Sequence, residues 1–166
     1  GASSIVRWNL AESFPDLNAV DRGFGGSEMA DSARYAARVV VPRAPRIVVL
    51  YPGENDLARG TTPETIGAGF VSFYGTIRKA LPATRIVAIG LKPTPARWHL
   101  TAKMHEANAL IRSYCEGHSG CVYVDVWPAM LGPDAKPRPE HFVSDGQHMT
   151  PAGYTVWTQL VRPLLK

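Results

Sequence analysis

Three short apolar runs, rich in β-branched residues, set the strongest limit on how this chain can fold. They are RIVVLYPG (46–53), RIVAIGL (85–91) and CVYVDV (121–126), and each has the length and composition of a buried strand. Segments with helical spacing of apolar residues separate the runs, so that strands and helices alternate along the chain. This alternation predicts a mostly parallel sheet with helices on both sides, because parallel neighbours need a long crossover connection that a helix usually supplies.

The clearest predicted helix lies between the first two runs. Thr62 is a suitable N-cap, and Pro63 after it fits the first helical turn. The apolar residues that then recur on one helical face are Ile66, Phe70, Phe73, Ile77 and Leu81. A last helix is expected after Thr150, again with a capping threonine followed by proline, and further helices are predicted at 27–40 and 101–114.

Length and composition indicate a globular chain. With 166 residues, 45% of them apolar and 19% charged, we expect one domain over residues 1–166. The 18 basic and 14 acidic residues leave a net charge of +4, scattered without a run, which does not favour a nucleic-acid partner. No apolar stretch reaches the length of a membrane span. The compartment stays open between exported and cytoplasmic, since no signal peptide is visible.

The two cysteines, Cys115 and Cys121, lie six residues apart in CEGHSGC. Three interpretations compete for them. They form a local disulfide, as in an oxidising compartment, or they are two free and partly buried thiols. In the third interpretation they bind a metal ion together with His118, although a structural zinc ion is bound by four ligands and only three are visible here.

Polar residues cluster in the loops that follow the predicted strands, and in parallel sheets ligands bind beyond the carboxyl ends of the strands. GASS (1–4) supplies serines, GFGGS (23–27) a glycine pair, GEND (53–56) an asparagine and DGQH (145–148) an acid and an imidazole. Each motif also has an ordinary interpretation, such as a turn serine, a flexible turn or an Asx turn. Their chemical interest lies in their combination.

Asp145 and His148 stand three residues apart, directly before the last predicted helix. At this spacing the carboxylate can accept a hydrogen bond from His148 Nδ1, which leaves Nε2 free to act as a base. A hydrolase of this type also needs a nucleophile and donors for an oxyanion. A serine, a glycine N–H and an asparagine amide in the other loops are the right groups for these tasks.

In this order, the four motifs resemble those of the SGNH (GDSL-like) hydrolases. The resemblance implies a flavodoxin-like three-layer α/β/α sandwich and a Ser3 nucleophile with Asp145 and His148 as its triad partners. It also implies an oxyanion hole built from the Ser3 N–H, the Gly26 N–H and the Asn55 side chain. No cofactor or metal is implied.

Two departures from the family pattern concern the first motif. Ala2 stands where the family usually has an acidic residue, and Ser4 is a second candidate for the nucleophile. In the family a central strand leads directly into the nucleophile turn, whereas this sequence starts at Gly1. We therefore expect the first strand to be missing from the sheet and a gap, or a strand outside this numbering, to lie beside Ser3.

The resemblance implies ester hydrolysis through an acyl-enzyme. No long apolar insertion is present to cover an acyl chain, so we expect short acyl groups, acetyl above all, on polar or carbohydrate alcohols. Arg97 and Trp98 follow a strand end and are candidates for substrate binding, or else for packing. Two alternatives remain: a lysophospholipase or thioesterase of the same family, and a non-catalytic binding domain that keeps the fold.

A metal-dependent hydrolase is the rival from another class. His141, Asp145 and His148 are close enough in sequence to suggest a ligand set. This interpretation leaves the serine, glycine and asparagine motifs without a role. The remaining histidines are expected on the surface or in loops, and they are His99, His105, His118 and His141.

Overall fold

The computed structural model describes all 166 residues, and its sheet has three parallel strands. They are β1 (Ile47–Leu50), β2 (Arg85–Ile89) and β3 (Cys121–Val124), paired in the order β1-β2-β3. In register, Val48 lies opposite Ile86, and Ile86 lies opposite Cys121. The three predicted strands and their parallel pairing are therefore confirmed, although each strand is shorter than the apolar run that predicts it.

The four long predicted helices are also present. The α-helices are α1 (Ser3–Val6), α2 (Leu10–Ser13), α3 (Met29–Val39), α4 (Glu54–Ala58), α5 (Pro63–Ala80), α6 (Thr101–Glu116) and α7 (Pro151–Val161). The 3-10 turns are η1 (Val41–Arg43), η2 (Pro95–Leu100), η3 (Pro128–Met130), η4 (Pro139–His141) and η5 (Arg162–Leu164). Thr62 and Thr150 cap α5 and α7 as predicted, because each hydroxyl accepts a backbone N–H three residues on. The helices α1, α2 and α4 span only one turn or so, too short to show a periodic pattern.

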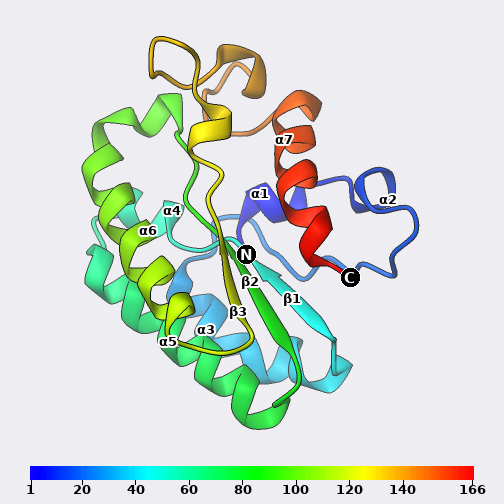
Figure 1. The fold of residues 1–166 in the computed structure, drawn as a ribbon. Coiled ribbons are helices and arrows are strands. Elements are labelled where there is room, and N and C mark those ends of the chain that lie inside the picture. Colours follow the sequence, from blue (N-terminus) through cyan, green and yellow to red (C-terminus); the bar gives the residue numbers. More distant parts are fainter.

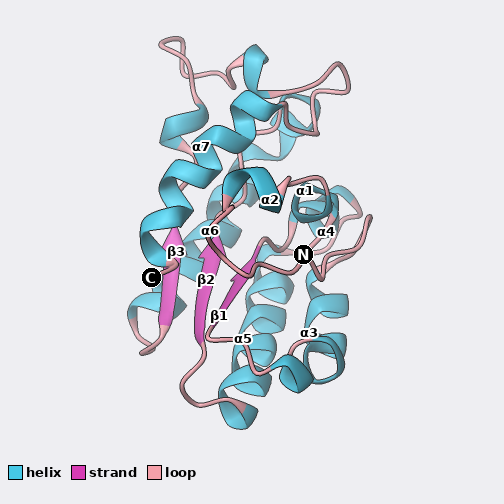
Figure 2. Ribbon diagram, turned by 90° about the vertical axis from the view of Figure 1, so that its right-hand side faces the viewer, coloured by secondary structure: helices cyan, strands magenta, loops and turns pink.

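The helices cover both faces of the sheet (Figures 1 and 2). The crossover helices α5 and α6 lie on the same face, because β1, β2 and β3 follow one another in one direction and such crossovers are right-handed. Helix α3 packs beside α5. Helix α7 covers the other face, where the Trp157 and Tyr51 rings lie 4.8 Å apart. The predicted α/β fold class is confirmed.

One hydrophobic cluster of 32 buried residues joins these layers. The predicted stripe of α5 lies in it, with Ile66, Phe70 and Ile77 completely buried. On α7, Tyr154 and Trp157 are buried in the same cluster. The core thus holds the sheet between α5 and α7 and leaves the loops beyond the strand ends to form a site.

An apolar groove of about 780 Å³ runs beside β1, which has no partner strand on the side away from β2. Its walls include Gly1, Val48 and Leu50, with Ala36 of α3 on the other side. The sequence predicts a gap beside Ser3, and this groove reaches Gly1, two residues before Ser3.

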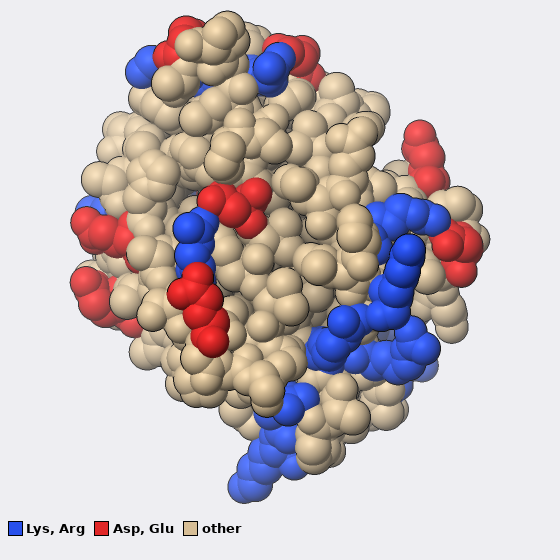
Figure 3. All heavy atoms as spheres, viewed as in Figure 1, with Lys and Arg blue, Asp and Glu red and all other residues tan.

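The charged side chains are less evenly spread in three dimensions than along the sequence. Figure 3 shows Lys and Arg gathered toward one side of the face it presents, while much of the centre of that face is uncharged. Arg22, Arg43 and Arg46 line the groove beside β1. None of the helices combines the length and apolarity that crossing a membrane requires.

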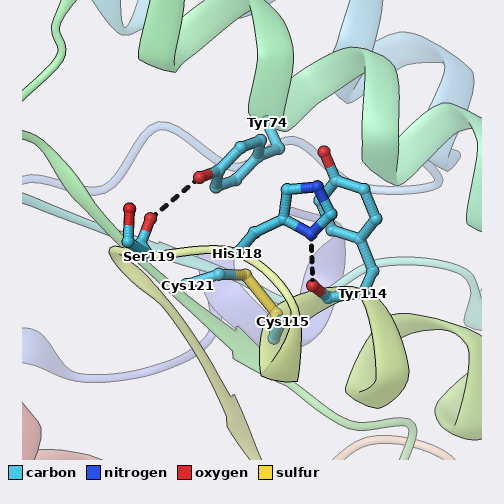
Figure 4. Close-up of a disulfide and its surroundings, with 6 residues drawn as sticks. All are labelled: Tyr74, Tyr114, Cys115, His118, Ser119 and Cys121. Atoms are coloured by element: carbon cyan, nitrogen blue, oxygen red, sulfur yellow. Dashed lines mark hydrogen bonds between the residues drawn. A yellow bond between two sulfur atoms is a disulfide. The ribbon is translucent and has the colours of Figure 1, made fainter.

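The cysteines form a disulfide between the last turn of α6 and the first residue of β3 (Figure 4). The Cα atoms of Cys115 and Cys121 are 4.7 Å apart, and no cysteine is free. The free-thiol and metal-binding interpretations are therefore wrong for this structure, since the two sulfur atoms are bonded to each other. His118, the third residue of the metal interpretation, instead stacks on Tyr114 with ring centroids 3.8 Å apart.

We expect the Cys115→Ala/Cys121→Ala double variant to be less stable by about 2 kcal/mol, because the disulfide closes only a short loop in the unfolded chain. For a chain of this size that loss corresponds to a melting temperature lower by about 4–8 °C. Thermal unfolding with and without reductant measures it. Reductant should lower the melting temperature of the wild type to that of the variant and leave the variant unchanged. An equal shift in both proteins would contradict the disulfide.

Candidate active site

Ser3 lies at the start of α1, half-buried, and points to the loop that precedes α7. Its Oγ is 3.0 Å from Nε2 of His148, across 145 residues of sequence. As the first residue of a helix, Ser3 has a backbone N–H without a partner inside that helix. Both the hydroxyl and the amide of this residue are therefore available for chemistry in the same small volume.

Asp145 and His148 contact each other as the spacing predicts. Asp145 Oδ2 lies 2.6 Å from His148 Nδ1, and its Oδ1 accepts the backbone N–H groups of Gln147 and His148 at 2.8 and 2.9 Å. The hydrogen bond from the imidazole holds the pKa of the Asp145 carboxyl well below its usual range. The carboxylate therefore selects the tautomer with hydrogen on Nδ1, and Nε2 is left to accept a hydrogen bond from Ser3.

The turn that carries Asp145 is fixed by its neighbours. Gly146 has a φ of +64°, which glycine adopts without strain, and its carbonyl accepts the N–H of Ala96 in η2 at 3.0 Å. The N–H of Val143 donates to the carbonyl of His148 at 2.9 Å. The first bond joins the turn to the segment after β2, and the second closes the loop between Val143 and His148, so that the acid and the imidazole lie on a loop held at both points.

Asn55 lies near the start of α4, and its side chain is bonded at both ends. Its Nδ2 donates to the carbonyl of Ser27 at 3.0 Å, and its Oδ1 accepts from Arg97 Nη2 at 3.2 Å. Gly26 precedes Ser27 and has a φ of +74°, a conformation that favours glycine. The structure thus brings the GFGGS and GEND motifs side by side, as an oxyanion hole of this composition requires.

Asp56, the next residue of the GEND motif, joins the same two loops. Both of its carboxylate oxygens accept the backbone N–H of Met29, the first residue of α3, at 2.9 and 3.0 Å. Burial raises the pKa of this carboxyl. The bond holds the glycine loop, which leads into α3, against α4 and thereby sets the distance between Gly26 and Asn55.

A buried ion pair, which the sequence pattern does not predict, lies behind these groups. Lys92 is completely buried, and its Nζ contacts Glu54 Oε2 and donates to Ser4 Oγ at 3.3 Å. Tyr51 donates its hydroxyl to the same carboxylate at 2.5 Å. Burial raises the pKa of Glu54, but the nearby ammonium and the hydrogen bonds outweigh it, and the net result is a lowered pKa. The only sequence signal is the position of Lys92 directly after an apolar strand.

Arg97 and Trp98, the candidates for substrate binding, both have partners within the protein. The Arg97 side chain is 15% exposed, and its Nη1 donates to the Glu54 carbonyl at 3.0 Å. The Trp98 ring stacks on Trp127 at 6.1 Å, and Lys136 Nζ lies 4.8 Å from the centre of the Trp98 ring. Their role in substrate binding stays a prediction, and the bonds of Arg97 give it a second possible role.

The residues of the rival metal site do not assemble. Asp145 and His148 bond to each other and to Ser3, and no group of three or more His, Cys, Asp or Glu side chains lies close enough to hold a metal ion. His141, expected on the surface or in a loop, lies in the turn η4 and is buried. The start of α7 covers it, because Thr150 donates its N–H to the His141 carbonyl.

Solved structures with this fold span nearly the whole chain. A Streptococcus pneumonia protein described as a platelet activating factor has a TM-score of 0.89 at 18% identity, covering 100% of this chain and 81% of its own. A GDSL-like lipase from Bacteroides thetaiotaomicron has a TM-score of 0.84 at 20% identity, and the match covers 98% of this chain and 83% of the lipase. An acetylxylan esterase from Geobacillus stearothermophilus has a TM-score of 0.72 at 17% identity, and the match covers 92% of this chain and 75% of the esterase.

These identities are low enough that the likeness concerns the fold. No curated protein sequence matches the chain significantly. The sequence profile of the GDSL-like Lipase/Acylhydrolase family matches residues 2–156, which include Ser3, Gly26, Asn55, Asp145 and His148. The resemblance found in the sequence is therefore confirmed, and the chain belongs to the GDSL-like lipase/acylhydrolase family of carboxylic ester hydrolases.

Proposed function

We propose that this protein hydrolyses short-chain acyl esters, acetyl esters above all, of polar or carbohydrate alcohols through an acyl-enzyme on Ser3. The observation that carries the proposal is the continuous chain of hydrogen bonds from Ser3 Oγ through His148 to Asp145. It is the arrangement in which a serine hydroxyl, unreactive by itself at neutral pH, becomes a nucleophile.

In the first half-reaction, Ser3 Oγ bonds to the ester carbonyl carbon while His148 Nε2 takes the hydroxyl proton. The pair of electrons of the carbonyl π bond moves to its oxygen, and Asp145 stabilises the imidazolium that forms. The tetrahedral intermediate then collapses, the bond to the alcohol oxygen breaks, and the leaving alcohol takes the proton from His148. Water repeats the sequence on the acyl-enzyme, releasing the carboxylic acid and restoring Ser3.

The oxyanion is proposed to accept hydrogen bonds from the backbone N–H groups of Ser3 and Gly26 and from Asn55 Nδ2. The amide nitrogen of Asn55 carries two hydrogens and donates one to Ser27, which leaves the second for the substrate. Such a donor contributes about 3 kcal/mol to the transition state when it is held in place before the reaction.

Two observations support a short acyl group and a polar alcohol. The side chain of Asp145 is 45% exposed and Gly26 is exposed, so the site is open to solvent at both of these residues. An open site accommodates a bulky, hydrated alcohol, whereas a long acyl chain needs apolar walls. The likeness to an acetylxylan esterase agrees with this choice.

The groove beside β1 favours a second candidate, a lysophospholipase or thioesterase. It is apolar and includes Gly1, only two residues from Ser3. Against an acyl chain stands the edge of β1, which forms one wall. The backbone N–H and C=O groups of such an edge need hydrogen-bond partners that a hydrocarbon chain does not have. The short-acyl function is therefore the better supported of the two.

We expect Ser3→Ala to lower kcat/KM for p-nitrophenyl acetate by about 10⁴-fold or more, because it removes the attacking oxygen. Ser4→Ala is the matched control and should keep most of the activity, since Ser4 is buried and bonded to Lys92. The opposite result would place the nucleophile at Ser4. Failure of a fluorophosphonate probe to label Ser3 in the wild type would instead indicate a non-catalytic binding domain.

The acid side of the pH profile should depend on a single group. His148 cannot take the Ser3 proton once it is itself protonated, whereas the lowered pKa of Asp145 keeps that carboxyl ionised to far lower pH. We therefore expect log kcat/KM to fall in acid with a limiting slope of one, because His148 takes up a proton there while Asp145 stays ionised. A slope of two would mean that Asp145 is protonated as well. Tryptophan fluorescence checks that the protein stays folded.

A panel of p-nitrophenyl esters from acetate to palmitate, run beside acetylated oligosaccharides, tests the substrate class. We expect kcat/KM to be highest for acetate, because each added methylene gains its roughly 0.8 kcal/mol only where an apolar wall covers it. Deacetylation of the oligosaccharides, followed as released acetate, is the expected positive result. A steady rise in kcat/KM from acetate to decanoate and beyond would favour the lysophospholipase or thioesterase.

A further inference from the structure

Asn55 can serve the oxyanion only in one of its two amide orientations, and the structure holds it in that one. Its Nδ2 points to the Ser27 carbonyl, an acceptor, and its Oδ1 points to Arg97 Nη2, a donor. A rotation of the amide by half a turn would set oxygen against the Ser27 carbonyl and nitrogen against the guanidinium, losing both hydrogen bonds. Arg97 and Ser27 therefore select the orientation from opposite ends of the amide.

Arg97 is itself held in a fixed place. Its Nη1 donates to the Glu54 carbonyl at 3.0 Å and lies 3.2 Å from Glu54 Oε1. Glu54 in turn is held by Lys92 and by the hydroxyl of Thr94, which donates to Oε1 at 3.2 Å. The guanidinium thus reaches the backbone, the carboxylate and the Asn55 amide together, which its planar fork of donors allows and a lysine ammonium does not.

We propose that Arg97 is a positioning residue for ester hydrolysis, which keeps the Asn55 amide turned toward the oxyanion and makes its N–H groups stronger donors. A cation bonded to the amide oxygen draws electron density from the amide nitrogen and so increases the positive character of its hydrogens. This inference rests on the proposed function, in which Asn55 donates to the oxyanion. It differs from the sequence-based prediction that Arg97 binds substrate.

A double-mutant cycle with Asn55→Ala, Arg97→Ala and the double variant tests the proposal, with p-nitrophenyl acetate as the substrate. We expect Arg97→Ala alone to lower kcat by about 10- to 100-fold with little change in KM, as for a misplaced catalytic group. In the Asn55→Ala background the same substitution should cost less than about threefold, because the group that Arg97 positions is already gone.

The outcomes separate this inference from the proposed function. If Asn55→Ala leaves kcat unchanged, the oxyanion role of Asn55 fails. If Asn55→Ala lowers kcat but Arg97→Ala acts on KM, or costs as much in the Asn55→Ala background as in the wild type, the positioning role alone is overturned. An effect of Arg97→Ala on KM that is the same with and without Asn55 is the result expected for an arginine that binds substrate.

Rescue by guanidinium ion provides a readout that a merely structural role would not give. At concentrations far below those that unfold the protein, the ion should restore part of kcat to Arg97→Ala but not to the double variant. Arg112→Ala, which removes an exposed arginine paired with Asp125, should show neither loss nor rescue. If Arg97→Ala does not fold, Arg97→Lys replaces it in the cycle, because it keeps a cation for Glu54 without the fork that reaches Asn55. Absence of both coupling and rescue would overturn the proposal.

Discussion

The site depends on the buried carboxylate of Glu54, which joins the loop after β1 to the segment after β2. Its two cationic partners, Lys92 and Arg97, both come from that second segment. A buried charge costs several kcal/mol unless its partners are complete, and removing one partner of such a pair typically costs about 3–5 kcal/mol. This penalty acts against any displacement of one loop relative to the other. The ionic contact thus fixes the short helix α4 relative to the segment that follows β2.

Helix α4 connects separate segments of the chain, because successive residues of a helix point in directions about 100° apart. Glu54 therefore faces the segment after β2, Asn55 faces Ser27 and Arg97, and Asp56 faces the start of α3. Three consecutive polar residues, all buried, thus reach two parts of the chain, the segment after β2 and the loop that leads into α3. The GEND motif supplies a catalytic candidate together with two side chains that hold the surrounding loops, which explains why a short helix at this place carries three polar groups.

The parts that the sequence predicts are those with local causes. The strands follow from continuous apolar runs, the starts of α5 and α7 from a threonine followed by proline, and the contact of Asp145 with His148 from their spacing. Other features depend on residues far apart in the chain. The burial of Lys92 requires a carboxylate 38 residues away. A lysine has no local pattern that indicates such a partner, so this feature becomes visible only in the fold. The two cysteines are only six residues apart, but their spacing alone does not distinguish a disulfide from two free thiols.

The two adjacent serines show how the same network separates chemistry from support. Ser3 is half-buried and reaches His148, whereas Ser4 is buried, with Lys92 on its hydroxyl and the Tyr154 hydroxyl on its carbonyl at 2.9 Å. Tyr154 belongs to α7, the helix that follows His148, so the nucleophile and its base are tied to a common element. Gly1, at the start of the chain, lines the groove along the unpaired edge of β1. The position of Ser3 therefore depends on the backbone of Ser4, which Tyr154 holds through its carbonyl, whereas the Ser4 hydroxyl is already engaged by Lys92.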